Sequence, residues 1–141
     1  MDRTTRASLL ARLPDSDLLA LSRLVVGDGD EITWLTPPTL GMVMARAEDG
    51  AKGEVFNLGE VLVTECQLQV GPHEGWAMLQ GNRPQGVFAA AAIDAVAGNV
   101  PTHPALPALD ARLETLIAEL DAIDAAERTA LAATRVQFDT Q

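Results

Sequence analysis

The sequence predicts an α+β fold, with helices at both ends of the chain and an antiparallel sheet between them. Helical patterns fill the beginning and the end of the chain, and strand-like runs separated by turn residues fill the middle. These runs follow one another closely, whereas parallel strands need crossovers of about a dozen residues or more. We therefore expect N-terminal helices, an antiparallel β-meander of about four to five strands, and two C-terminal helices.

Two short helices are expected at the N-terminus, over residues 4–13 and 15–26, separated at Pro14. Proline lacks the N–H group that a continuous helix needs, so one helix ends before it and another begins after it. Asp15 or Ser16 is expected to cap the second helix by accepting a hydrogen bond from a free N–H group of its first turn.

The middle of the chain contains apolar runs bounded by proline and glycine. Pro37-Pro38 is expected to stop the first strand, and Gly59 is expected to separate two later strands. The expected strands are residues 32–35, 40–47, 54–58, 60–70 and 76–80. Within 60–70, the more apolar alternate face should pack inward. This face comprises Leu62, Thr64, Cys66, Leu68 and Val70.

Residues 84–97 predict a helix that is apolar on nearly every side, with Asp94 as its only charge. Such a helix must be buried all round, and its alanines permit close approach of neighbouring backbones. Two explanations stay open: the helix is central within this chain, or a partner covers part of it. Phe88 and Ile93 are therefore candidates for a subunit interface.

A longer amphipathic helix is expected from about residue 108 to residue 134. At about 1.5 Å per residue it would span roughly 40 Å, which is more than a domain of this size covers. Either the helix breaks near Ala125-Ala126, or it projects from the domain. We expect the helix and tail over residues 108–141 to project toward a partner, with Arg135 and Phe138 as interface candidates.

The stretch Gly81-Asn82-Arg83-Pro84 admits three interpretations. Pro84 suits the first turn of a helix, where free N–H groups favour an anion, and the Arg83 guanidinium is a fork suited to phosphate or phosphonate oxygens. The plain alternative is a turn with Arg83 in solvent. In the third, Arg83 pairs with an acid of a partner subunit. Gly81, Asn82 and Arg83 are thus candidates for anion binding or for an interface, and the acidity of the chain favours the interface.

Composition excludes several classes of protein. The 141 residues form one expected domain, 1–141, and the net charge is −10, from 20 acidic and 10 basic residues. Such a surface repels a phosphate backbone, so no nucleic-acid partner is expected. There is no signal peptide and no apolar run near the roughly 18 residues of a membrane span, so we expect a cytoplasmic protein without a membrane partner.

No residues are arranged for catalysis. His73 and His103 are the only histidines, and neither has an acid, cysteine or serine beside it in a triad pattern. The single Cys66 falls on the apolar strand face, which predicts an inert core thiol, and no Cys/His cluster has zinc-ligand spacing. We expect no catalytic residue, no metal and no cofactor in this chain.

Three stretches carry a resemblance to a known family: GEVFNLGEVLVTECQLQV at residues 53–70, GWAMLQGNRPQ at 75–85 and ATRVQFDTQ at 133–141. In the order and spacing of these stretches, the chain resembles the PhnG subunit family of the bacterial carbon–phosphorus lyase core complex. The likeness covers nearly the whole chain.

The resemblance implies a required subunit of a complex that works in organic phosphonate catabolism. With the H, I and L subunits, such a subunit supports conversion of ATP and methylphosphonate into alpha-D-ribose 1-methylphosphonate 5-triphosphate, with release of adenine. The J subunit later breaks the carbon–phosphorus bond, and the G, H, I and J subunits form a stable core. The resemblance assigns no catalytic residue to this chain.

Two other functions stay open on the residues alone. An independent anion- or nucleotide-binding module would use the helix start at residues 81–84, and micromolar binding of ATP or methylphosphonate by the isolated chain would favour it. A self-assembling structural domain is the third hypothesis. Because the 84–97 helix is nearly all apolar, the isolated chain is expected to associate with itself.

Overall fold

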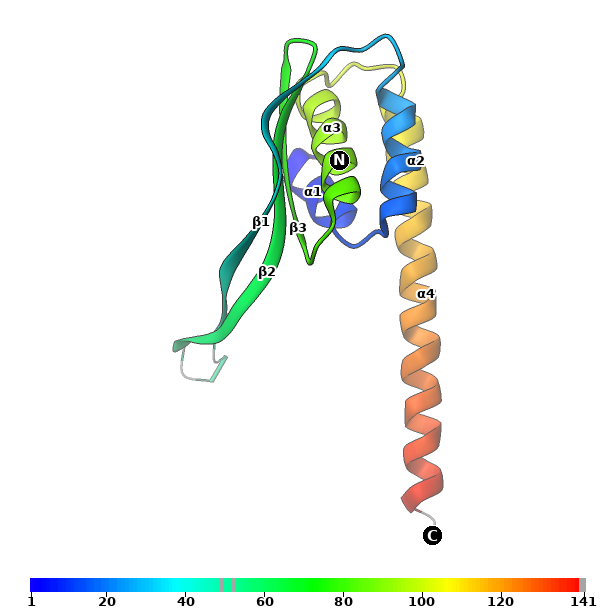
Figure 1. Ribbon diagram of the computed structural model, residues 1–141. Helices are drawn as coiled ribbons and strands as arrows, with labels where there is room; N and C mark the ends of the chain where they lie inside the picture. Colours follow the sequence, from blue (N-terminus) through cyan, green and yellow to red (C-terminus); the bar gives the residue numbers. More distant parts are fainter. Residues whose placement is uncertain (49, 52, 140–141) are drawn as a thin grey trace.

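The computed structural model describes residues 1–48, 50–51 and 53–139, with side chains up to residue 132. Its elements are α1 (Arg3–Leu10), α2 (Asp15–Val25), β1 (Ile32–Glu48), β2 (Val55–Val70), β3 (His73–Gln80), α3 (Pro84–Asn99) and α4 (Leu106–Asp139). The three strands form one antiparallel sheet in the order β1-β2-β3 (Figure 1). The predicted α+β class is confirmed.

The described residues contain three strands, so the expectation of four to five is wrong. Pro37-Pro38 and Gly59 do not end strands, because the β1–β2 ladder absorbs both interruptions as shifts of register. One set of shifts lies between Trp34 and Thr39, around the prolines, and another follows Ala45, which pairs with Gly59. Gly59 has a φ of 130°, a conformation that glycine adopts without strain.

The first two helices are separated around Pro14, as predicted, but the expected capping is wrong. Pro14 is itself the N-cap residue of α2, and no side chain caps that helix. The Asp15 carboxylate instead binds Arg83, at the start of α3. An aspartate in the first helical turn therefore serves a contact between two helices.

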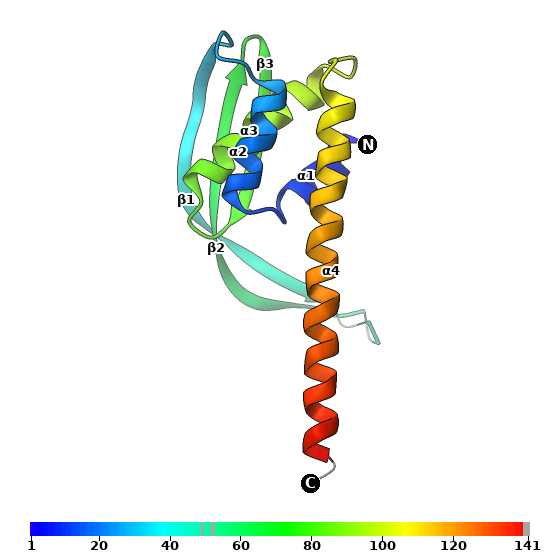
Figure 2. The same ribbon diagram turned by 90° about the vertical axis from the view of Figure 1, so that its right-hand side faces the viewer.

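Helix α3 is the centre of the fold, with the sheet on one side and α1 and α2 on the other (Figures 1 and 2). Of the two explanations for its apolar surface, coverage within the chain is therefore the correct one. The predicted inward face of β2 is confirmed where β3 runs beside it, because Thr64, Cys66, Leu68 and Val70 are all buried. The buried residues of α3 are Gly86, Val87, Ala89, Ala90, Ala91, Ala92, Ile93, Ala95, Val96 and Ala97.

Small residues let the neighbouring elements reach the backbone of α3. A Cβ atom added to Gly75 of β3 would overlap the backbone of Ala91 and Ala95, so strand and helix pack without a side chain between them. Gly98 lies one residue before the last residue of α3, Asn99. The absence of a side chain at Gly98 leaves room for the Arg3 guanidinium.

Helix α4 packs on the body with its first half only. Leu109 and Leu113 are fully buried, whereas Ile123 is 55% exposed. The Arg6 guanidinium of α1 binds Asp110 at 3.0 Å and fixes the packed half. The helix does not break near residues 125–126 but continues past the body (Figures 1 and 2). None of the described helices is apolar over a length that would cross a membrane.

Gly75→Ala is expected to destabilise the chain by about 1–3 kcal/mol or more, because the new methyl group has no space against α3. Gly29→Ala is the matched control, since a Cβ atom there meets nothing within 4 Å. Urea unfolding of both variants measures the difference. Equal midpoints for Gly75→Ala and the wild-type chain would contradict the close packing of β3 on α3.

Candidate subunit interface

A two-stranded hairpin leaves the body of the protein (Figure 1). It consists of residues 40–48 of β1 and residues 55–62 of β2, and we call it the arm. Strand β3 pairs only with residues 63–70 of β2, so the arm has no third strand in the described part of the chain. Isolated two-stranded ribbons are at best marginally stable in water.

The arm exposes large apolar side chains on both faces. Met42 pairs with Leu62 on one face, and Val43 pairs with Val61 on the other. The exposed apolar residues of the arm are Leu40, Met42, Val43, Met44, Val55, Phe56, Leu58 and Leu62, and Leu58 reaches 66%. A contiguous surface of this kind marks an interaction site. The arm is therefore the strongest candidate for a subunit interface.

The arm is not the interface that the sequence analysis predicted, although the sequence pattern of the arm is unusual for a strand. Residues 40–47 and 54–58 are apolar at both alternate positions, whereas a strand with one solvated face alternates apolar and polar residues. The arm extends beyond the helices that cover the sheet, so both of its apolar faces stay exposed (Figure 1).

The predicted interface residues are spread over the chain. Ile93 is fully buried inside the chain, whose sheet and helices already cover it. Phe88 is partly buried against Trp34 of β1, with ring centroids 5.4 Å apart. Arg135 and Phe138 lie on α4, but their side chains lie outside the described residues. The second half of α4 does expose Leu131, at 64%.

The turn from β3 into α3 is built around the hydroxyl group of Thr64. This hydroxyl donates to the carbonyl of Gly81 at 2.6 Å and accepts the N–H of Arg83 at 2.8 Å. Gly81 has a φ of 89°, which makes glycine favourable at the turn. Arg83 is the N-cap residue of α3, and Pro84 fills the first helical position as predicted.

The guanidinium of Arg83 is neutralised inside the chain. Its Nε donates to Asp15 Oδ1 at 2.8 Å, and one terminal nitrogen donates to the carbonyl of Leu13 at 2.6 Å. A Cβ atom at Gly86 would overlap the Asp15 carboxylate, so this glycine keeps space for the pair. The contact joins α2 to α3, and an anion at this helix start would compete with Asp15. Asn82, beside it, is exposed.

The side chains able to do chemistry lie apart from one another. Cys66 is fully buried, and burial raises the pKa of its thiol to about 11, so the thiol is protonated and unreactive at neutral pH. His103 Nδ1 accepts the N–H of Ala105 at 3.1 Å, while His73 begins β3. No group of three metal-ligating side chains occurs among the described residues.

Fold and surface together define a small α+β body with an apolar arm and a long helix, both of which expose apolar side chains in the described part of the chain. The family model for phosphonate metabolism protein PhnG matches residues 1–141, so the chain belongs to the PhnG family. The resemblance inferred from the sequence is confirmed. A relative from Rhizobium meliloti (strain 1021), named alpha-D-ribose 1-methylphosphonate 5-triphosphate synthase subunit PhnG, is 33% identical over 133 residues. The match covers 94% of this chain and 83% of the relative.

A double-mutant cycle of Arg83→Ala and Asp15→Ala is expected to give a coupling energy of about 1–3 kcal/mol. The reason is that the pair is partly buried and that the Arg83 guanidinium is also held by the Leu13 carbonyl. Arg12 and Asp121 form the control pair, since their side chains are 40% and 60% exposed. That pair should couple much more weakly, because solvent screens exposed charges. The measurement is denaturant unfolding. Equal coupling in the two pairs would show that the Arg83 contact does not hold α2 to α3.

Proposed function

We propose that this chain is a required subunit of the carbon–phosphorus lyase system, acting in the step that forms alpha-D-ribose 1-methylphosphonate 5-triphosphate from ATP and methylphosphonate with release of adenine. The observation that carries this proposal is the uncovered arm, which needs a partner surface. The Rhizobium relative is named as a synthase subunit, which supports the same role. The partners would be the H, I, J and L types of subunit, in the cytoplasm.

We further propose that the chain contributes structure, and that catalytic groups come from its partners. Two facts support this division. The thiol of Cys66 is buried and protonated, and the Arg83 guanidinium is engaged by Asp15 and Leu13. The alternative of an independent anion-binding module would require Arg83 to exchange these bonds for a ligand. Isothermal titration of the isolated chain with ATP and with methylphosphonate distinguishes the two, and we expect no binding in the micromolar range.

Leu58→Glu is expected to prevent assembly while the chain itself stays folded. The side chain is 66% exposed, so the substitution should change the stability of the chain by no more than about 0.5 kcal/mol. Against an apolar partner surface, however, a desolvated carboxylate should weaken binding by about tenfold or more, which is about 1.4 kcal/mol. Co-expression with the H, I and J subunits, followed by size exclusion and an assay of adenine release with the L subunit added, provides the measurement.

Leu24→Glu is the matched control, because Leu24 is also exposed, at 43%, but lies on α2 away from the arm. Normal assembly and adenine release are expected for this variant. If Leu58→Glu assembles as well as Leu24→Glu does, the arm is not the interface.

A further inference from the structure

We propose that the free edge of β3, from Trp76 to Gln80, receives an extended acidic segment of a partner subunit as a fourth strand, held in the groove between β3 and α1. The inference rests on the proposed function, because another subunit supplies the strand. It concerns a surface separate from the arm, on the opposite edge of the sheet from β1.

The register of the sheet decides which backbone groups face the free edge. Gly81 donates its N–H to the carbonyl of Leu62 on β2 at 2.8 Å, and in an antiparallel ladder the bonded residues alternate. Ala77 and Leu79 therefore bond to β2, whereas the amide and carbonyl groups of Trp76 and Met78 point away from it. The next outward amide belongs to Gln80.

Helix α3 closes the first half of this edge. Asp94 accepts the outward N–H of Trp76 at 3.0 Å, and the Asn99 side chain donates to the carbonyl of Glu74 at 2.8 Å. Beyond this point the edge is open. Within the described part of the chain, no hydrogen bond reaches the outward carbonyl of Trp76, the amide and carbonyl of Met78, or the amide of Gln80. These four groups have the alternation that an added strand would match.

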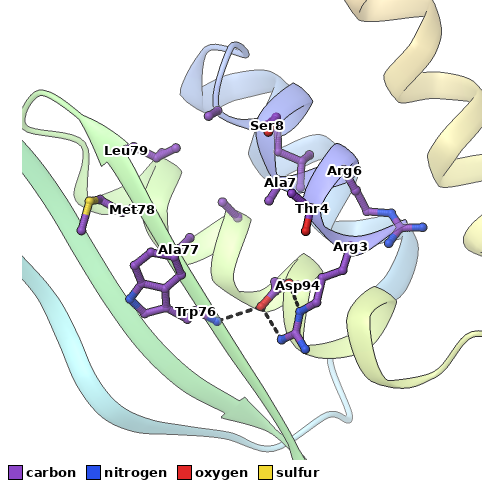
Figure 3. A pocket seen from close by; sticks show the side chains of 13 residues that line it. Arg3, Thr4, Arg6, Ala7, Ser8, Trp76, Ala77, Met78, Leu79 and Asp94 are labelled. Carbon is purple, nitrogen blue, oxygen red and sulfur yellow. Dashed lines mark hydrogen bonds and ion pairs between the residues drawn. The ribbon is translucent and has the colours of Figure 1, made fainter. Parts of the chain in front are cut away.

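The open half of the edge forms one side of a cavity of about 420 Å³, whose other side is α1 (Figure 3). Short side chains along it come from Thr4, Ala7 and Ser8 of α1 and from Ala11, the C-cap residue of that helix. Leu10, Leu79 and Ala90 supply apolar lining. A strand pairs at about 4.8 Å from its neighbour, and short side chains on α1 leave room for one at that distance.

Charge indicates what kind of segment fits. The charged side chains that line the groove are Arg3, Arg6 and Asp94, and the Arg6 guanidinium is already paired with Asp110. Arg3 is therefore the cation that the groove presents, in a chain of net charge −10. Arg3 binds Asp94 at 2.7 Å and is still 50% exposed, so its free side can take a carboxylate (Figure 3). An acidic residue at the end of the segment near Trp76 would complete this contact. A row of alternating backbone groups matches an extended main chain better than it matches a compact ligand.

The amide hydrogen of Met78 reports directly on strand addition. In the isolated, dilute chain it should exchange quickly with solvent, whereas the amides of Ala77 and Leu79 should be protected by β2. In the complex reconstituted with the H, I and J subunits, exchange at Met78 should slow by about tenfold or more. If the complex forms and Met78 still exchanges quickly, the strand proposal is wrong and the proposed function stands. If no complex forms, both fail. Slow exchange in the isolated chain at high concentration would identify a second copy as the occupant and overturn the partner strand.

Two substitutions test the same site through binding. Met78→Pro removes the outward N–H but no bond to β2, and proline is tolerated at edge positions of this kind, so the chain should fold while partner affinity falls about tenfold. Met78→Ala is its control and should bind normally. Ala7→Trp fills the groove from α1 and leaves β3 unchanged, and Ala118→Trp places the same side chain at an exposed alanine of α4. Normal binding by Ala7→Trp would overturn the proposal even if Met78→Pro does not fold.

Discussion

The whole structure depends on the need to cover α3 on every side. This helix has one charged residue, Asp94, and both sides of the helix are apolar, so no orientation of it leaves a face for water. The sheet covers one side, and the helices α1 and α2 cover the other. Even its polar groups serve this arrangement, because Asp94 binds Arg3 and the Trp76 amide at once. The close contacts at Gly75, Gly86 and Gly98 follow from the same requirement.

The part of the sheet that packs on α3 does not include the arm, so the arm stays uncovered. Only residues 63–70 of β2 lie between two strands, and there the inward side chains are buried. Beyond them the same strand continues with β1 alone, and its apolar residues are exposed. The body can therefore be stable as a single chain while the arm cannot bury its own surface.

Local features of the sequence predicted the parts of the fold that depend on local chemistry. The break at Pro14, the helix start at Pro84 and the inward face of β2 all follow from the hydrogen bonds and the alternation of a few neighbouring residues. The strand count was wrong because a ladder tolerates Pro37-Pro38 or Gly59 by shifting its register, and this depends on the partner strand.

The site was less predictable, because its contacts join distant parts of the chain. Asp15 and Arg83 are 68 residues apart, and nothing in either neighbourhood indicates the other. The sequence predicted that α3 must be covered. It could not show what covers the helix, because a helix buried by a partner and a helix buried by the chain's own elements have the same apolar residue pattern. The arm was recognisable in principle from its two apolar faces, and the groove at β3 was not, since it depends on how α1 packs.

Shortening the arm tests most directly whether the body folds by itself and the arm is needed only for assembly with partners. Residues 44–60 would be replaced by Asn-Gly, a dipeptide that favours a two-residue hairpin turn, between the paired residues Val43 and Val61. Thermal unfolding of this variant should remain a single sharp transition, with a midpoint within about 4 °C of the wild type because little buried surface is lost. Assembly with the H, I and J subunits should be abolished. A shortened chain that fails to fold, or one that assembles normally, would contradict the account.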